Sequence, residues 1–282
     1  MNALLLTCIV IGISMQNIIK KYYNEKIKFG AYTFVAISVA AASFFFACSA
    51  SFDLTFSTDY LGYSAAFAAT YAVAVVFSFL AITSGPLSIT ALMFSYSLVI
   101  PTLYGMIFLG EEASVTLIIG LCLLAVSLFL INSRTGGGKI TLKWIVYVLL
   151  AFLGNGVCTV VQNLQQREFS GLYKSEFMIA ALITVVVIVI APIIICERRE
   201  FLPSMKRGGI LMVLCGVING ASNLLVMLLV NRMNASVLYP VMSAGGVLLT
   251  FFVSLFIYKE RLAVKQYISF AFGIAAIVLM NI

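Results

Sequence analysis

The chain has 282 residues, of which 63% are hydrophobic and only 10% are charged, and its mean hydropathy is +1.13. Soluble domains are about 45 to 50% apolar and about 25% charged, so this composition excludes an ordinary soluble domain. The formal net charge of +7 does not by itself indicate nucleic acid, because in such a chain the placement of basic residues among the loops is more informative.

Ten apolar runs follow one another along the chain, and most are long enough to cross a hydrocarbon core, which takes about 20 helical residues. They are continuously apolar rather than alternating, which predicts helices and not barrel strands. The first run has no basic segment before it and no clear cleavage site, so we expect a retained helix. The sequence predicts an all-α polytopic protein of a bacterial cytoplasmic (inner or plasma) membrane, with helices at 3–20, 30–51, 60–82, 87–109, 114–132, 144–165, 174–196, 208–230, 235–257 and 262–282.

The basic residues are unevenly shared between the two sides of this predicted topology. The loops after the first, fifth, seventh and ninth helices hold 14 of the 17 lysines and arginines. Basic loops usually face the cytoplasm, so this bias predicts that both chain ends lie outside.

An internal duplication is predicted from the midpoint of the chain. The glycine-rich linker 133–143 leaves five predicted helices in 1–132 and five in 144–282. An offset of 148 residues aligns Ser95 with Ser243, Thr102 with Thr250 and Glu112 with Glu260 without a gap. Because each half has an odd number of helices, the two would cross the membrane in opposite senses, as inverted repeats of secondary transporters do.

A second marker of duplication is the pair Gln16-Asn17, which recurs as Gln162-Asn163. Both pairs fall near the end of the first predicted helix of their half, where an amide stays hydrated at little cost. We therefore interpret them as matching positions of two repeats, and leave open that Asn17 or Asn163 reaches the mouth of a cavity.

Polar side chains recur at helical spacing on four of the predicted helices. In lipid such groups must find partners, so the faces that carry them should point inward. One interpretation is close helix packing, since Gly216 and Gly220 have the small-xxx-small spacing at which amides bond across the contact. The other is a cavity that binds a polar solute, with Tyr71, Ser95, Tyr96, Thr102, Asn219, Asn223, Tyr239, Ser243 and Thr250 as candidate binding residues.

The predicted site has little of the chemistry that enzymes use. Histidine is absent, which excludes a Ser-His triad and a His-ligated metal, and no phosphate-binding GxxxxGK[ST] motif occurs. We expect no catalysis, cofactor or metal, and we expect the six cysteines to be free packing residues. Glu112 and Glu260 are expected to cap the helices that follow them, and Lys20 to anchor a helix at the lipid headgroups. With no charge deep in the predicted helices, the cargo should be neutral or zwitterionic.

The two halves resemble the drug/metabolite transporter superfamily, in particular its ten-helix EamA-type members. The resemblance rests on IPTLYGMIFLGEEAS (100–114) and on LYPVMSAGGVLLTFFVSLFIYKERLAVKQ (238–266), each with a proline followed by a glutamate at the end of the fourth helix of its half. It implies a pore built from the third, fourth, eighth and ninth helices, cytoplasmic chain ends and export. The resemblance thus implies that both chain ends are cytoplasmic, whereas the distribution of basic residues predicts that both lie outside. Four-helix relatives carry a carboxylate in their first helix where this chain has Gly12 or Ile13, which argues against proton-coupled cation exchange.

These observations favour a secondary transporter, an exporter by family precedent, that moves a small polar or amphipathic metabolite by alternating access. Its expected partners are that small molecule and membrane lipid, with no nucleic acid. The alternative is a lipid-handling or accessory membrane protein without solute transport, whose cavity would open sideways to lipid.

Overall fold

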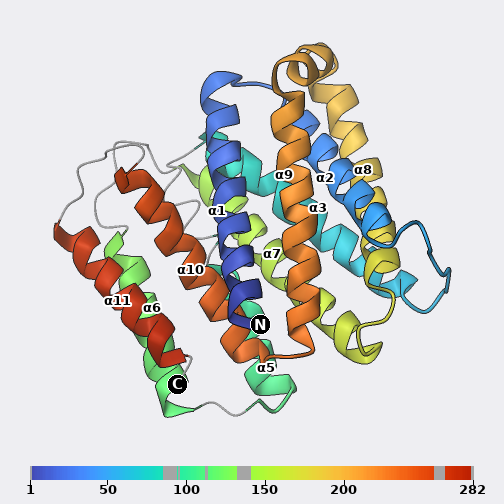
Figure 1. Ribbon diagram of the computed structural model, residues 1–282. Coiled ribbons are helices and arrows are strands. Elements are labelled where there is room, and N and C mark those ends of the chain that lie inside the picture. Colours follow the sequence, from blue (N-terminus) through green and yellow to red (C-terminus); the bar gives the residue numbers. More distant parts are fainter. Residues whose placement is uncertain are drawn as a thin grey trace.

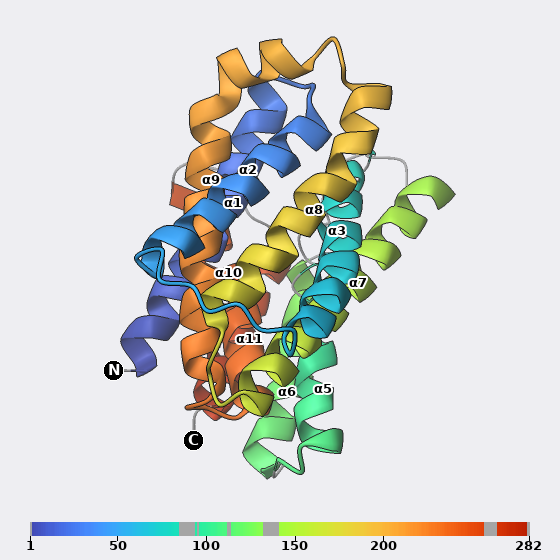
Figure 2. The ribbon, with the colours of Figure 1, turned by 90° about the vertical axis from the view of Figure 1, so that its right-hand side faces the viewer.

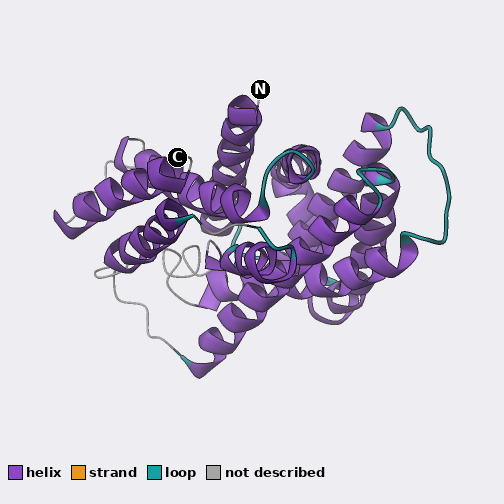
Figure 3. Cartoon of the chain, turned by 90° about the horizontal axis from the view of Figure 1, so that it is seen from below, coloured by secondary structure: helices purple, strands orange, loops and turns teal. Residues whose placement is uncertain are grey.

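The computed structural model describes residues 2–84, 94, 96–111, 114–131, 141–256 and 264–280. Within these ranges every regular element is a helix (Figures 1 and 3). The helices are α1 (Asn2–Lys26), α2 (Ala31–Ser49), α3 (Leu61–Ser84), α5 (Val99–Phe108), α6 (Val115–Ile131), α7 (Leu142–Glu168), α8 (Lys174–Cys196), α9 (Phe201–Val230), α10 (Ala235–Phe256) and α11 (Val264–Met280).

The described helices agree with the ten apolar runs, and the all-α prediction is confirmed for this part of the chain. The main difference lies in the fourth run, 87–109, where Ser97 and Leu98 form a turn and α5 begins only at Val99. Pro101 then lies in the first turn of α5, where its missing N–H needs no partner. The turn therefore precedes the proline, and Pro101 does not break α5.

Three helices are longer than their apolar runs. α1 continues to Lys26, α7 to Glu168, and α9 begins at Phe201. Charged residues can extend a helix beyond the hydrocarbon, so apolarity alone underestimates helix length. One consequence is that Gln16 does not end its helix, as the sequence suggested, but lies well inside α1.

Several of these helices have the length and composition of membrane spans. In the described ranges six qualify, namely α1, α2, α3, α7, α8 and α9, while α5 and part of α6 are shorter apolar helices. Many large apolar side chains on them are exposed, including Ile190, Ile195 and Ile210. Such a surface is unfavourable in water and suits lipid, as expected for an integral membrane protein.

Helices from the two halves of the chain interleave (Figures 1 and 2). α1 packs against α9 and α10, and α7 packs against α3 and α5. α2 contacts α8 and α9, and α3 contacts α8, so that one apolar core joins these four helices with α1. The second core lies between α1, α9 and α10, and α6 pairs with α11 at the edge of the bundle.

The N-terminus of α2 is capped by a carboxylate from the other half of the chain. Glu197, at the end of α8, accepts hydrogen bonds from the backbone N–H groups of Tyr32 and Thr33, each at 2.9 Å. The hydroxyl of Thr33 donates to the same carboxylate at 2.9 Å. The first N–H groups of a helix have no partner within it, and the helix dipole favours an anion there, so buried Glu197 satisfies both.

Gly216 lets α9 approach α2 more closely than any larger residue would. A Cβ atom built on Gly216 would collide with the backbone carbonyl oxygen of Ser38 in α2. Next to this contact, the Ser38 hydroxyl donates to the Met212 carbonyl of α9 at 3.0 Å. The predicted small-xxx-small interpretation therefore holds for Gly216.

We predict that Gly216→Ala destabilises the protein while Gly209→Ala does not. Both positions lie in α9, but a Cβ on Gly209 meets nothing within 4 Å. Overpacking of a close contact costs about 1 to 3 kcal/mol, whereas alanine in an open helical position is favourable by up to about 1 kcal/mol. Thermal unfolding of the two variants in detergent would measure the difference, and equal melting temperatures would contradict the close contact.

Candidate functional site

A cavity of about 200 Å³ lies at the centre of the bundle. Its walls come from α1, α3, α7, α9 and α10, together with Phe94 and Leu98. More than half of the lining side chains are polar, which is unusual for the interior of a bundle in lipid. They are Gln16, Asn17, Lys20, Tyr71, Ser78, Asn155, Thr159, Gln162, Asn219, Ser222, Asn223, Tyr239 and Ser243.

The α1 and α7 walls carry the same spacing of residues. Along α1 the cavity is lined by Ile9, Ile13, Gln16 and Lys20, and along α7 by Asn155, Thr159 and Gln162. Both series follow the i, i+4, i+7 pattern of one helix face, and they are related by an offset of 146 residues. The two glutamines thus occupy matching places on opposite walls.

A cluster of side-chain amides crosses the cavity wall. Asn219 donates to the Gln16 oxygen at 3.0 Å and accepts from the Tyr71 hydroxyl at 3.2 Å. Asn223, one turn later on α9, donates to the Asn219 backbone carbonyl at 3.0 Å and accepts from the Gln162 amide at 3.4 Å. These bonds link α1, α3, α7 and α9 around one space, so the amides hold the cavity wall in place as well as lining it.

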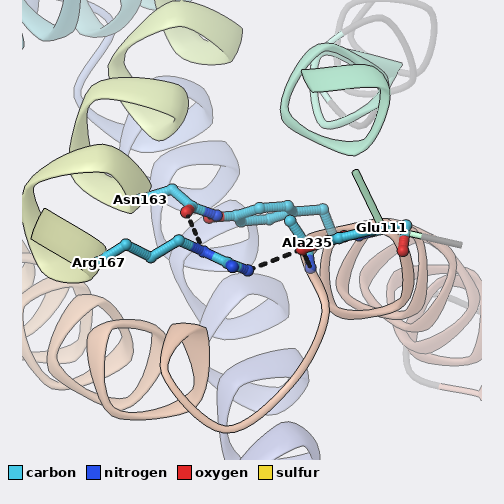
Figure 4. Close-up of polar contacts among 6 residues, drawn as sticks. Glu111, Asn163, Arg167 and Ala235 are labelled. Carbon is cyan, nitrogen blue, oxygen red and sulfur yellow. Dashed lines mark hydrogen bonds and ion pairs between the residues drawn. The ribbon is translucent and has the colours of Figure 1, made fainter. Parts of the chain in front are cut away.

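The α10 end of the cavity is closed by a chain of polar contacts (Figure 4). Asn163 donates to the Tyr239 hydroxyl at 3.2 Å, and its oxygen accepts from Arg167 at 2.8 Å. Arg167 in turn forms an ion pair of 2.7 Å with Glu111. Tyr239 is 0% exposed and Asn163 1%, so this end of the cavity is shut in the structure.

Glu111 also caps α10. Its two carboxylate oxygens accept from the backbone N–H groups of Ala235, at 2.9 Å, and Ser236, at 2.8 Å. Gly110 makes this possible, since its φ of +63° turns the chain after α5 so that Glu111 reaches the next element. The expected capping residue, Glu112, lies outside the described residues, as does Glu260. Ser114 provides a cap for α6, accepting from the Leu117 N–H at 3.1 Å.

The structure brings five of the nine predicted binding residues to the cavity wall, namely Tyr71, Asn219, Asn223, Tyr239 and Ser243. Tyr96 and Thr102 do not line it. Thr102 is buried and its hydroxyl donates to the Leu98 carbonyl of its own helix, while Tyr96 donates to the Ala125 carbonyl of α6. Tyr96 precedes the turn at Ser97 and Leu98, whereas Thr102 follows it in α5. Ser95, and the side chain of Thr250, lie outside what the structure describes.

Several lining residues were not predicted from the sequence. Asn155 and Thr159 share one helix face with Gln162, and that spacing was available as a signal. Lys20 was expected at the headgroups, but it lines the cavity, because α1 continues beyond it to Lys26. The expectation of an interior without charge is therefore wrong at this position, and Lys20 is the one charged side chain among the described lining residues.

The described residues offer no cluster for metal chemistry. In those ranges no three His, Cys, Asp or Glu side chains come together. Each of the six cysteines is a free thiol, and Cys158, the one that lines the cavity, is buried. The chemistry available at the wall is hydrogen bonding by amides and hydroxyls, plus one ammonium group.

Comparisons with known proteins agree with this architecture. A search of curated protein sequences finds no match. Solved structures do match, in 28 chains; one of them, a crystal structure of a protein, aligns with 99% of this chain and 95% of its own, with a TM-score of 0.79 and 12% sequence identity. At this identity the likeness concerns the fold alone. The model of the EamA-like transporter family matches residues 142–282, which is half of the sequence. The chain therefore belongs to the EamA-like transporter family of the drug/metabolite transporter superfamily.

Proposed function

We propose that the protein is a secondary transporter of a small polar metabolite, working by alternating access in a bacterial cytoplasmic membrane. The observation that carries this proposal is the polar cavity at the centre of an apolar bundle, closed at one end by contacts that can break without unfolding a helix. Export is the direction that family precedent favours. Pockets for drug-sized ligands measure about 300 to 1,000 Å³, so a cavity of about 200 Å³ suits a small metabolite.

The pairing of helices supports two inverted repeats, 1–132 and 144–282. If the halves are inverted repeats, each helix of the first half has a counterpart in the second: α1 and α7, α2 and α8, α3 and α9, α5 and α10, α6 and α11. Every contact between two helices should then have a matching contact between their counterparts. The contacts of α1 with α9 and α10 become those of α7 with α3 and α5, and both occur. The pairs α2–α8, α5–α10 and α6–α11 each map onto themselves and also occur. A pseudo-twofold axis in the membrane plane relates the halves of many transporters in this way.

In this proposal the chain from Tyr239 through Asn163 and Arg167 to Glu111 is a gate. Because Tyr239 belongs to α10 and Asn163 to α7, rocking of the two helices apart would break the bond of 3.2 Å between them and open the cavity. The surface pocket outside this end includes Arg167 and Arg232, so the gate would open onto a space that already exists.

We predict that Asn219→Leu abolishes transport while leaving the protein in the membrane. The substitution removes three hydrogen-bonding side-chain contacts at the cavity wall, to Gln16, Tyr71 and Asn223. Counterflow of a broad panel of labelled metabolites in proteoliposomes would measure transport, and yield in the membrane fraction would measure insertion.

Thr184→Leu is the matched control for this substitution. Thr184 is exposed on α8, and its hydroxyl bonds only within its own helix, to Ala180 at 2.8 Å. Its replacement should leave counterflow unchanged. If wild-type protein moves no member of the panel and instead exchanges lipid between leaflets, the transporter proposal fails and the lipid-handling alternative holds.

The gate gives a second prediction, for Glu111→Gln. The variant loses the charge that holds Arg167, and a loss of about 1.4 kcal/mol from the closed state would raise the open population about tenfold. We expect a cysteine placed at Ser243, in a background without the native cysteines, to react correspondingly faster with an impermeant thiol reagent added on the Arg232 side.

Glu200→Gln is the control for the gate, because Glu200 is exposed and forms no side-chain hydrogen bond or ion pair in the described part of the chain. It should leave the labelling rate at the wild-type value. Equal rates in wild type and Glu111→Gln would show that the ion pair does not restrain opening.

A further inference from the structure

We infer that Lys20 recognises a carboxylate on the transported metabolite, so that the substrates are small compounds with one anionic group. This inference rests on the proposed function and names the substrate class of the same cavity. It replaces the expectation of a neutral cargo, which assumed that no charge lines the interior.

Lys20 points into the bundle and not only toward the membrane surface. It lines the central cavity and also a second, smaller cavity beside it, between α1, α2, α3 and α9. It is half-buried, and among the described residues it has no hydrogen bond and no ion pair. A half-buried ammonium group without a partner in the described part of the chain is available for a charge-assisted hydrogen bond with an incoming anion.

The amide cluster next to Lys20 also offers donors. The side-chain oxygens of Gln16, Asn219 and Asn223 are all occupied by bonds within the cluster. The amide nitrogen of Gln16, one helical turn before Lys20, has no acceptor in the described part of the chain, so its hydrogens are available to a ligand. A cation with an N–H donor one turn away is an arrangement that binds carboxylate through charge-assisted hydrogen bonds.

Positive charge is also found outside the cavity, beyond the proposed gate at its α10 end. The surface pocket outside the gate is lined by Arg167 and Arg232, and no acidic residue is among its described lining. A substrate with a negative group would thus meet a cation at the inner wall and cations at the exit. A cationic substrate would meet no carboxylate among the described lining residues, and Glu111, beyond the cavity, is already held by Arg167 and by the start of α10.

The size of the cavity and the single ammonium favour a small carboxylate over a large phosphorylated compound. The planar fork of arginine is well suited to phosphate, and no arginine is among the described residues that line the cavity. A lipid phosphate near the end of α1 is a second source of the same anionic chemistry. We place the soluble carboxylate at Lys20 because this residue lines two interior cavities.

The test compares carboxylates with their uncharged amides. Benzoate and benzamide, lactate and lactamide, and further pairs of this kind would be titrated against the purified full-length protein, with thermal stabilisation as the readout of binding. We expect carboxylates to bind more tightly than their amides. In Lys20→Gln the carboxylate affinity should fall at least tenfold, while the affinity for the amide stays within twofold.

Two control variants test whether the loss of carboxylate affinity is due to the charge of Lys20 itself. Lys26→Gln removes the same charge from the same end of α1, but Lys26 is exposed and lines neither cavity, so carboxylate affinity should not change. Lys20→Arg keeps the charge and should retain most of the affinity. The titrations would be repeated in nanodiscs with and without phosphatidylglycerol.

Carboxylate affinity that is equal in wild type and Lys20→Gln would overturn the inference, as would amides that bind better than carboxylates. It would also be overturned if the Lys20 effect appeared only with the anionic lipid. In these cases transport of neutral compounds would leave the proposed function intact. If no compound of either kind binds or is moved, the proposed function fails together with the inference.

Discussion

The arrangement of the two halves depends on one constraint, that the first N–H groups of a buried helix must find acceptors where water is excluded. Two glutamates meet it for helices outside their own half. Glu197, from the second half, holds the start of α2, and Glu111, from the first half, holds the start of α10. The two caps lie at opposite ends of the bundle, since α2 begins at the upper end in Figure 1 and α10 at the lower end. Each half is therefore fixed to the other by a charge-assisted contact at either end.

The two capping glutamates differ in the partners that they have besides the N–H groups of the capped helix. Among the described residues, the Glu197 carboxylate bonds only to the start of α2, through two N–H groups and one hydroxyl. In Glu111 one oxygen is shared between two donors: Oε1 accepts from the Ala235 N–H and also from Arg167. This second contact connects the cap to Asn163 and so to Tyr239 at the cavity wall. A structural cap at one end of the molecule thus has a counterpart at the other end that is coupled to the cavity.

Apolarity and spacing were sufficient to predict the helices, because in lipid each span must satisfy its own backbone and be long enough to cross. They also located Asn219, Asn223, Tyr239 and Ser243 at the cavity, since polar groups at i, i+4 and i+7 share one face. The turn at Ser97 and Leu98 was not predicted, because 87–109 was taken as one continuous apolar run, and Tyr96 and Thr102 from this run do not line the cavity. Lys20 and Gln16 were assigned to a helix end because the apolar run stops there, whereas α1 continues to Lys26. The cap by Glu111 is a contact between segments far apart in sequence, which no local pattern encodes.

In the proposed gate, opening would separate two charges, because Arg167 would leave the Glu111 oxygen that it shares with the Ala235 N–H. When Arg167 leaves, Glu111 keeps the two amide donors of α10 as partners, so a neutral pair separates into an anchored anion and a movable guanidinium. Moving one elementary charge through the full transmembrane potential is worth about 2.3 kcal/mol per 100 mV, and through a tenth of it about 0.2 kcal/mol. If the proposed gate opens in this way, a displacement of Arg167 along the membrane normal would give the open and closed states different energies in an energised membrane, and this difference would be absent in detergent.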